Sequence, residues 1–119
     1  MKIRIKGNSL RYRLTKSDVA AIIKDGRLEE CTEFGHGAAL AYALQTTTDY
    51  DLSATFKDNR ITLFVPHTMI DQLANTDEVG FESGQDKLFL LVEKDFTCLD
   101  NVAEDQSDNY PNPLAEKVK

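Results

Sequence analysis

The stretch Lys2-Ile3-Arg4-Ile5-Lys6-Gly7-Asn8-Ser9-Leu10-Arg11-Tyr12-Arg13-Leu14 decides the fold that we expect for this chain. Apolar residues alternate with basic residues along it, which is the period-two pattern of half-buried β-strands. Gly7-Asn8 suits a two-residue hairpin turn, because both residue types tolerate a positive φ. The stretch therefore predicts a β-hairpin with one apolar face and one basic face.

The residues that follow predict a helix and a second hairpin. Thr15-Lys16-Ser17-Asp18 is a capping sequence, and the apolar spacing after it predicts a helix that ends at Gly26. Residues 27–34 and 39–47 are expected as strands on either side of the turn Gly35-His36-Gly37. A helix is the alternative for residues 39–47, since alanine and leucine favour helices. The alternation of large and small residues there favours a strand.

The second half of the chain repeats this order. We expect strands at 52–57 and 61–65, a short helix after Pro66, and strands at 79–82 and 88–94. A shift of about 51 positions superposes Leu10 on Ile61 and Tyr12 on Leu63, although generic hairpins could match in this way by coincidence. The expected fold class is α+β, with a largely antiparallel sheet or barrel built from two ββαββ-like halves with two short helices. The interior of such a sheet is either packed with side chains or holds a ligand.

We expect a single domain over residues 1–96 and an acidic, Pro/Asn-rich tail over residues 97–119. The tail is either disordered or folded back, with Phe96, Leu99 and Tyr110 as apolar anchors and its carboxylates against the basic hairpin. We favour a partly docked tail, because Tyr-Pro-Asn-Pro has little conformational entropy to lose. The tail also holds oxygen ligands for a hard cation, although their spacing is not that of an EF-hand. These residues are Asp100, Asn101, Glu104, Asp105, Asp108, Asn109 and Asn112.

The formal net charge of −6 argues against two classes of partner. Its long-range field repels phosphate, so we expect binding neither to nucleic acid nor to a membrane. No apolar run approaches the ~18 residues of a membrane span, and no secretion signal precedes the first strand. We therefore expect a cytoplasmic protein in which Cys31 and Cys98 are reduced thiols.

Residues at both ends of the chain carry a resemblance to a known family. They are Met1 to Ser9 with Arg13 to Ser17, the pair Phe34-Gly35, Glu93 to Phe96, Cys98-Leu99, and Glu104 to Pro113. In these segments the chain resembles a family of small, uncharacterised bacterial proteins that share a domain of unknown function. That family has no established activity, so the resemblance implies no catalytic residues.

The basic face of the first hairpin is the candidate binding site. Guanidinium groups hold phosphate or carboxylate bidentately, so several of them together could bind a polyanion. In the alternative interpretation, these charges pair with carboxylates on neighbouring strands, such as Glu29 and Glu33. Tyr12 is expected on the apolar side, which argues against stacking of nucleobases beside the positive charge. The anion-binding candidates are Lys2, Arg4, Lys6, Arg11 and Arg13.

The function expected from these patterns is a small cytoplasmic binding or interaction domain for a protein partner or a small anionic ligand, without a cofactor or a metal. The alternative is a metal-dependent phosphohydrolase acting on a phosphate-rich small molecule, with Glu29, Glu33 and Glu82 near the basic face. The hairpin resembles enzymes whose antiparallel tunnels bind triphosphate, but their first strand carries Glu-x-Glu-x-Lys where this one reads Lys2-x-Arg4-x-Lys6. The spacing of the two cysteines and two histidines (Cys31, His36, His67, Cys98) matches no zinc finger or ribbon.

Overall fold

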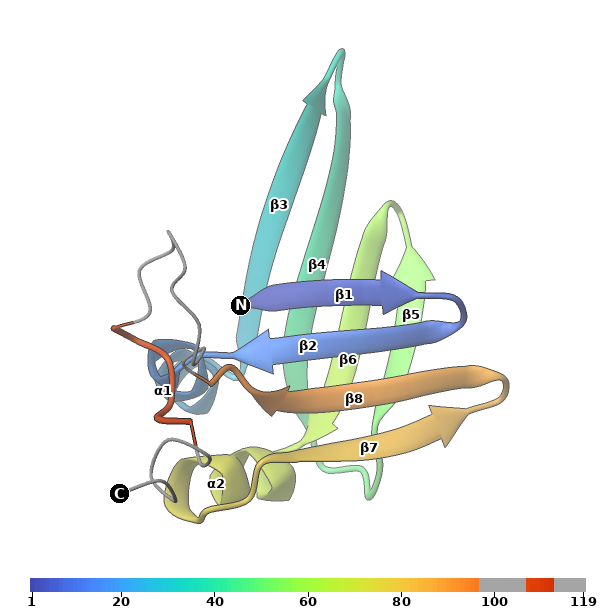
Figure 1. Ribbon diagram of the computed structural model, residues 1–119. Coiled ribbons are helices and arrows are strands. Elements are labelled where there is room, and N and C mark those ends of the chain that lie inside the picture. The colour runs from blue at the N-terminus through green and yellow to red at the C-terminus, as the bar shows by residue number, and fades with distance from the viewer. Residues whose placement is uncertain (97–106, 113–119) are drawn as a thin grey trace.

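Two successive ββαββ units make up the part of the chain that the computed structural model describes, residues 1–96 and 107–112 (Figure 1). The first unit contains β1 (Lys2–Lys6), β2 (Ser9–Leu14), α1 (Lys16–Asp25), β3 (Arg27–Gly35) and β4 (Ala38–Thr47). The second contains β5 (Ser53–Lys57), β6 (Arg60–Pro66), α2 (His67–Asn75), β7 (Gly80–Gln85) and β8 (Leu88–Lys94). The predicted α+β fold with two ββαββ halves is confirmed.

The strands form two four-stranded sheets, and each sheet combines one hairpin from each unit. Sheet A has the order β1-β2-β8-β7, and sheet B has the order β3-β4-β6-β5. Strands within each hairpin are antiparallel, whereas β2 pairs with β8 and β4 pairs with β6 in parallel. The predicted largely antiparallel character is confirmed, whereas the barrel alternative is wrong, because the described strands form two separate sheets. Each hairpin pairs with a hairpin of the other unit, and among the described strands no ladder joins sheet A to sheet B.

The pairing registers show that an approximate two-fold operation exchanges the units. Ser9 of β2 pairs with Phe89 in sheet A, and Arg60 of β6 pairs with Ala41 in sheet B. Residues of β1, β2 and α1 thus correspond to residues about 51 positions later in β5, β6 and α2, as the sequence repeat predicted. The same registers relate β4 to β8, so that Leu40 corresponds to Leu88. The operation carries sheet A onto sheet B.

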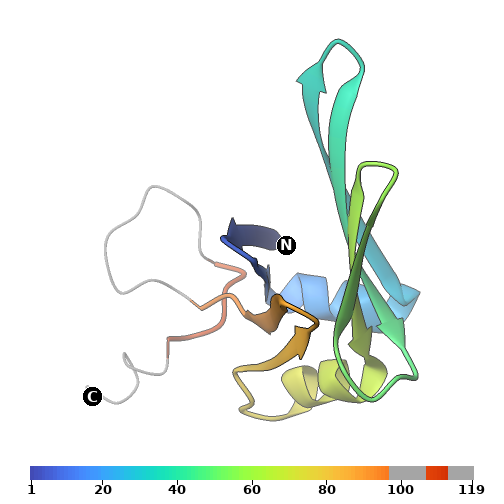
Figure 2. The ribbon, with the colours of Figure 1, turned by 90° about the vertical axis from the view of Figure 1, so that its right-hand side faces the viewer.

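Buried apolar side chains from both sheets and both helices form one core. Fully buried residues include Tyr12 and Leu14 of β2 and their counterparts Leu63 and Val65 of β6. Helices α1 and α2 lie at one end of the two sheets (Figures 1 and 2). They bury an apolar stripe there, with Val19 and Ile22 from α1 and Ile70 and Leu73 from α2. The space between the sheets is therefore packed at the helix end.

Local sequence signals explain how α1 begins and ends. Thr15 and Asp18 form a reciprocal capping box at the amino end. Gly26 adopts φ 73° at the carboxyl end, where its amide donates to the Ile22 carbonyl.

The end of strand β7 differs from the sequence prediction. Strand β7 extends to Gln85, beyond residue 82, where the sequence predicted its end. Gly84 pairs with Phe89 in the ladder, and Asp86 takes the positive φ that the turn requires.

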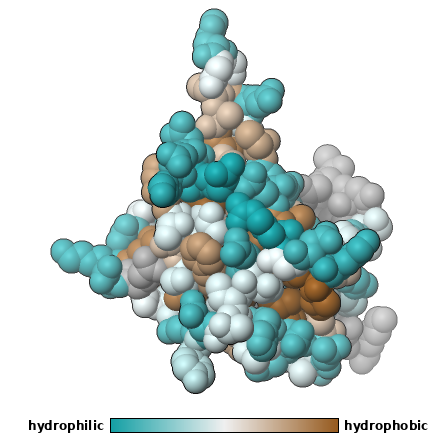
Figure 3. Space-filling model, turned by 180° about the vertical axis from the view of Figure 1, so that it is seen from behind, coloured by the Kyte–Doolittle hydropathy of each residue, from teal (hydrophilic) through white to brown (hydrophobic). Residues whose placement is uncertain are grey.

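The β3–β4 hairpin extends beyond the other strands (Figure 1). Its turn carries three successive positive φ angles at Gly35, His36 and Gly37, which two glycines allow. Phe34 beside the turn is 66% exposed. Figure 3 shows this hairpin projecting above the rear face of the molecule, where hydrophilic and hydrophobic residues are interspersed. The residue pattern predicted both strands, including the strand at Ala38–Thr47.

Residues 107–112 lie against the start of α1 and the end of β8. The backbone carbonyl of Asp108 accepts from the Lys16 amide at 3.2 Å, and its carboxylate accepts from the Ser17 hydroxyl and amide. The Tyr110 amide donates to the Asp95 carbonyl at 2.9 Å, and the Tyr110 ring meets Phe96 edge to face. Asp108 thus lies at the amino end of α1, where a negative charge is favourable, and not on the basic hairpin. The expected anchor Leu99, the oxygen ligands Asp100, Asn101, Glu104 and Asp105, and the thiol of Cys98 lie outside the described residues.

Candidate functional site

The five basic candidates lie together on the outer face of sheet A. Lys2, Arg4 and Lys6 alternate along β1, and Arg11 and Arg13 alternate along β2. Lys2 lies opposite Arg13, and Arg4 lies opposite Arg11. Their alternation with the buried residues of β2 directs these side chains away from the core. The sheet therefore collects five positive charges on one surface.

Two carboxylates from β8 and the residue after it neutralise part of this charge. Arg13 Nε lies 2.9 Å and Arg11 Nε lies 3.6 Å from Glu93 Oε1. Lys2 Nζ lies 3.2 Å from Asp95 Oδ2, and the Asp95 residue is only 4% exposed. Asp95 also joins three segments, because its amide donates to Leu14 and its carbonyl accepts from Tyr110.

The prediction that Glu29 and Glu33 pair with the basic hairpin is wrong. Both lie on β3 in sheet B, because the units exchange hairpins and β2 pairs with β8. Arg27 and Arg60 each approach Glu29 Oε1 to 2.7 Å. The hydrogen bond from Arg27 contributes most, and the one from Arg60 next, to holding the pKa of the Glu29 carboxyl below its usual value. Glu33 lies near the tip of the β3–β4 hairpin.

A small pocket on the outer face of sheet A is lined by Arg4, Lys6, Ser9 and Arg11 and has a volume of about 130 Å³. Within residues 1–96 and 107–112, neither Arg4 nor Lys6 takes part in an ion pair. Arg4 directly faces Arg11, and like charges at opposed positions of a sheet destabilise it. Glu93 approaches only the Arg11 side of this pair. The pocket therefore combines uncompensated positive charge with room for a small anion.

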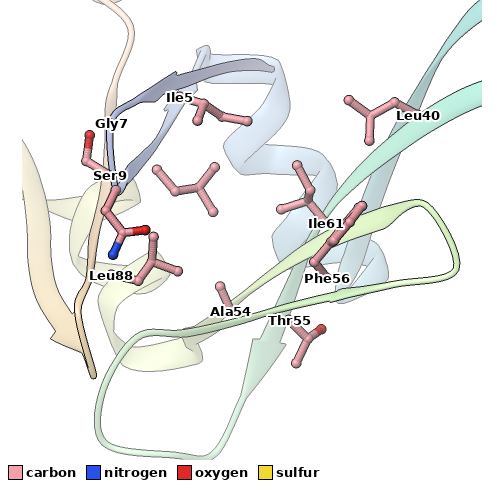
Figure 4. Close-up of a pocket in the computed structure, with 11 residues that line it drawn as sticks. Ile5, Gly7, Ser9, Leu40, Ala54, Thr55, Phe56, Ile61 and Leu88 are labelled. Carbon is pink, nitrogen blue, oxygen red and sulfur yellow. The ribbon is translucent and has the colours of Figure 1, made fainter.

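A second concavity opens between the two sheets, at the end that the helices do not close. This inter-sheet groove has a volume of about 550 Å³ (Figure 4). Three pairs of two-fold-related apolar residues line it: Ile5 and Phe56, Leu10 and Ile61, and Leu40 and Leu88. The sequence left open whether the interior is packed or hollow. The structure has a packed interior at one end and a hollow at the other.

The remaining cysteine and histidine candidates of the described part of the chain lie on separate elements. Cys31 is an exposed free thiol on β3, His36 lies in the β3–β4 turn, and His67 begins α2. No group of three or more histidine, cysteine or acidic side chains among the described residues is placed to hold a metal ion. Tyr12 points into the core, where burial raises the pKa of its hydroxyl.

Sequence reasoning missed Glu93 and Asp95 as partners of the basic face. Their acidic character was visible, but nothing local in the sequence shows that β8 lies beside β2 in parallel. Of the described helices, none is long and apolar enough to cross a membrane.

Comparisons with known proteins give a family and no activity. No curated protein and no solved structure matches the chain. The model of a family of unknown function, DUF7009, matches residues 1–114 and confirms the resemblance to a family without an established activity. The chain belongs to this family.

Proposed function

We propose that this protein is a binding domain that holds a small anionic group, a phosphate or a carboxylate, on the outer face of sheet A. Arg4, Lys6 and Arg11 contact the anion directly. Lys2 and Arg13 belong to the same basic face, but they are engaged with Asp95 and Glu93 and contribute mainly to the local positive potential.

One observation carries this proposal: the pocket formed by Arg4, Lys6, Ser9 and Arg11 contains two cations, Arg4 and Lys6, that form no ion pair within residues 1–96 and 107–112. A bound phosphate would neutralise the facing Arg4 and Arg11 pair and accept charge-assisted hydrogen bonds from both guanidinium groups. Folding alone gives no reason to keep two like charges opposed at this position.

A thermal-shift titration with inorganic phosphate and pyrophosphate tests the proposal. Binding to the native state raises the melting temperature as the ligand concentration increases. We expect pyrophosphate to stabilise the protein more than phosphate does, and Lys6→Ala to reduce both shifts. Lys57→Ala is the matched control, because Lys57 occupies the two-fold-related position on sheet B.

Two results would overturn the anion site. The first is a melting temperature that neither anion changes. The second is an equal reduction of the anion-induced thermal shift in Lys6→Ala and Lys57→Ala, which would point to unspecific screening of charge. Potassium chloride at matched ionic strength separates screening from site binding.

The phosphohydrolase alternative stays an untested prediction that no specific contact favours. Arg27 and Arg60 engage Glu29, and Glu33 lies near the tip of the β3–β4 hairpin. A cytoplasmic location also stays a prediction, and the unpaired thiol of Cys31 supports it.

A further inference from the structure

We infer that the inter-sheet groove is a second binding site, which takes the hydrocarbon chain of a small single-chain carboxylate of the fatty-acid class. This inference is independent of the anion site, because it concerns the opposite face of the β1–β2 hairpin. The groove lies between the sheets, whereas Arg4 and Arg11 lie on the outer face of sheet A.

The shape of the groove suits a small molecule. Its volume of about 550 Å³ falls within the range of roughly 300–1,000 Å³ that is typical of small-molecule sites. Leu10 and Ile61, which are almost fully buried, are among the residues that line it. Figure 4 shows Ile5 and Leu88 on one side of the space and Leu40 and Phe56 on the other. A ligand in this position would be enclosed by both sheets.

The walls of the groove are apolar, and two of the side chains that form them are largely exposed to water, which is unfavourable. Ile5 is 60% exposed and its two-fold counterpart Phe56 is 69% exposed. Side chains of this size gain about 1.5–3 kcal/mol when they are fully buried, so an occupant that covers them is stabilised by the hydrophobic effect. Both units preserve this exposure at equivalent positions, although neither sheet needs it to form its ladder.

A lysine at the mouth of the groove favours an anionic head group. Every charged residue that adjoins a lining residue in the sequence is basic, and none is acidic. On the strands these residues are Arg4, Lys6, Arg11, Lys57 and Arg60, whose side chains alternate with the lining residues and therefore point away from the groove. Lys87 lies in the β7–β8 turn at the mouth of the groove, where its backbone carbonyl accepts from the side chain of Asn8, a lining residue. Arg11 and Arg60 are engaged with Glu93 and Glu29, whereas within the described residues Lys6, Lys57 and Lys87 form no ion pair. An alkyl chain that ends in a carboxylate matches both the apolar walls and the exposed Lys87 at the mouth of the groove.

Isothermal titration calorimetry with hexanoate, octanoate and decanoate, each below its micelle concentration, tests this inference. If methylene groups enter the groove, the dissociation constant should fall by up to about fourfold for each added methylene, or about fifteenfold from octanoate to decanoate. Decanoate should also bind about two- to fivefold more tightly than decanol, because exposed cations add a modest attraction to the carboxylate.

Two phenylalanines provide a matched pair of variants. Phe56→Ser removes one wall of the groove, and we expect it to weaken decanoate binding about tenfold or more. Phe34→Ser changes an equally exposed phenylalanine at the tip of the β3–β4 hairpin and should leave the dissociation constant unchanged. Both side chains are more than 60% exposed, so neither substitution should unfold the protein. Circular dichroism verifies the fold of each variant.

The inference is overturned if affinity does not depend on chain length, or if Phe34→Ser weakens binding as much as Phe56→Ser. Sedimentation equilibrium gives a third decisive result. A dimer of the parent protein that Phe56→Ser dissociates would show that a second copy of the chain occupies the groove. A protein that stays monomeric with decanoate bound agrees with the inference. Phosphate binding by the outer face is unaffected by any of these outcomes, so the two sites succeed or fail separately.

Discussion

The β1–β2 and β5–β6 hairpins occupy equivalent places in the fold and carry different outer faces. Lys2, Arg4, Arg11 and Arg13 in the first correspond to Ser53, Thr55, Thr62 and Phe64 in the second. Only the pair Lys6 and Lys57 is basic in both. The inner faces, in contrast, are apolar in both hairpins. Packing therefore constrains the inner faces of the two units alike, and the difference in charge needs an explanation that the apolar core does not supply.

The neighbouring strands differ in the same sense. Glu93, beside Arg13, corresponds to Gln45, beside Phe64. Asp95 corresponds to Thr47. Sheet A thus carries its own neutralising carboxylates, but they pair with Lys2, Arg11 and Arg13. In the part of the chain that the structure describes, Arg4 and Lys6 have no such partner. The comparison separates charges that support the structure from charges that are available to a ligand.

The largest expected effect tests the similarity of the inner faces. Leu14 of β2 and Leu63 of β6 are both fully buried in the shared core. Each change to alanine should lower the free energy of unfolding by roughly 2–5 kcal/mol, because it leaves a cavity in a packed interior. Urea denaturation followed by circular dichroism measures both. A cost below about 1 kcal/mol for either variant would show that the inner face of its hairpin does not belong to the packed core.

A smaller effect tests the structural charges. Lys2→Met leaves the buried Asp95 carboxylate without its ion pair to Lys2, and we expect a loss of about 1–2 kcal/mol. This value is below that of a fully buried pair, because the Lys2 side chain is 47% exposed. Ser53→Ala at the equivalent position should stay within about 0.5 kcal/mol. Equal effects of the two variants in urea denaturation would contradict a structural role for the Lys2–Asp95 pair.

The amino ends of the two helices extend the comparison. Asp108 binds Ser17 at the start of α1, whereas α2 has no side-chain cap among the described contacts. The hydrogen bonds from Ser17, and then from Thr15, lower the pKa of the Asp108 carboxyl. A lowered folded-state pKa means that the stabilisation is present above the unfolded-state pKa and is lost as the pH falls through the folded-state pKa.

The parent protein should therefore melt higher than Asp108→Asn near neutral pH, and the difference should shrink below about pH 4. Melting curves of both proteins across this range measure it. Thr68→Ala, at the position that corresponds to Ser17, serves as the control and should show no such pH dependence. A difference between the parent and Asp108→Asn that stays constant in acid would mean that Asp108 contributes through its shape and not its charge.

Local patterns in the sequence predicted most of the secondary structure and the repeat. Alternation in β1, β2 and β4, the capping box at Thr15 and the turn at Gly7-Asn8 act over a few residues, so they can be read directly. The exchange of hairpins between the units could not be predicted from the sequence, because the parallel pairing of β2 with β8 joins residues about 80 positions apart. For that reason the basic face was predicted, whereas its partners Glu93 and Asp95 and the inter-sheet groove were not.

The most direct test of the anion site replaces two arginines on the outer face of sheet A by the residues at the equivalent positions of sheet B. Arg4→Thr combined with Arg11→Thr gives the first hairpin the residues that Thr55 and Thr62 provide in the second. The double variant should keep the unfolding free energy of the parent, or gain slightly from the removal of like-charge repulsion, and should lose the thermal shift caused by pyrophosphate. An unchanged thermal shift would contradict our assignment of these arginines to ligand binding, as would a large loss of stability without ligand.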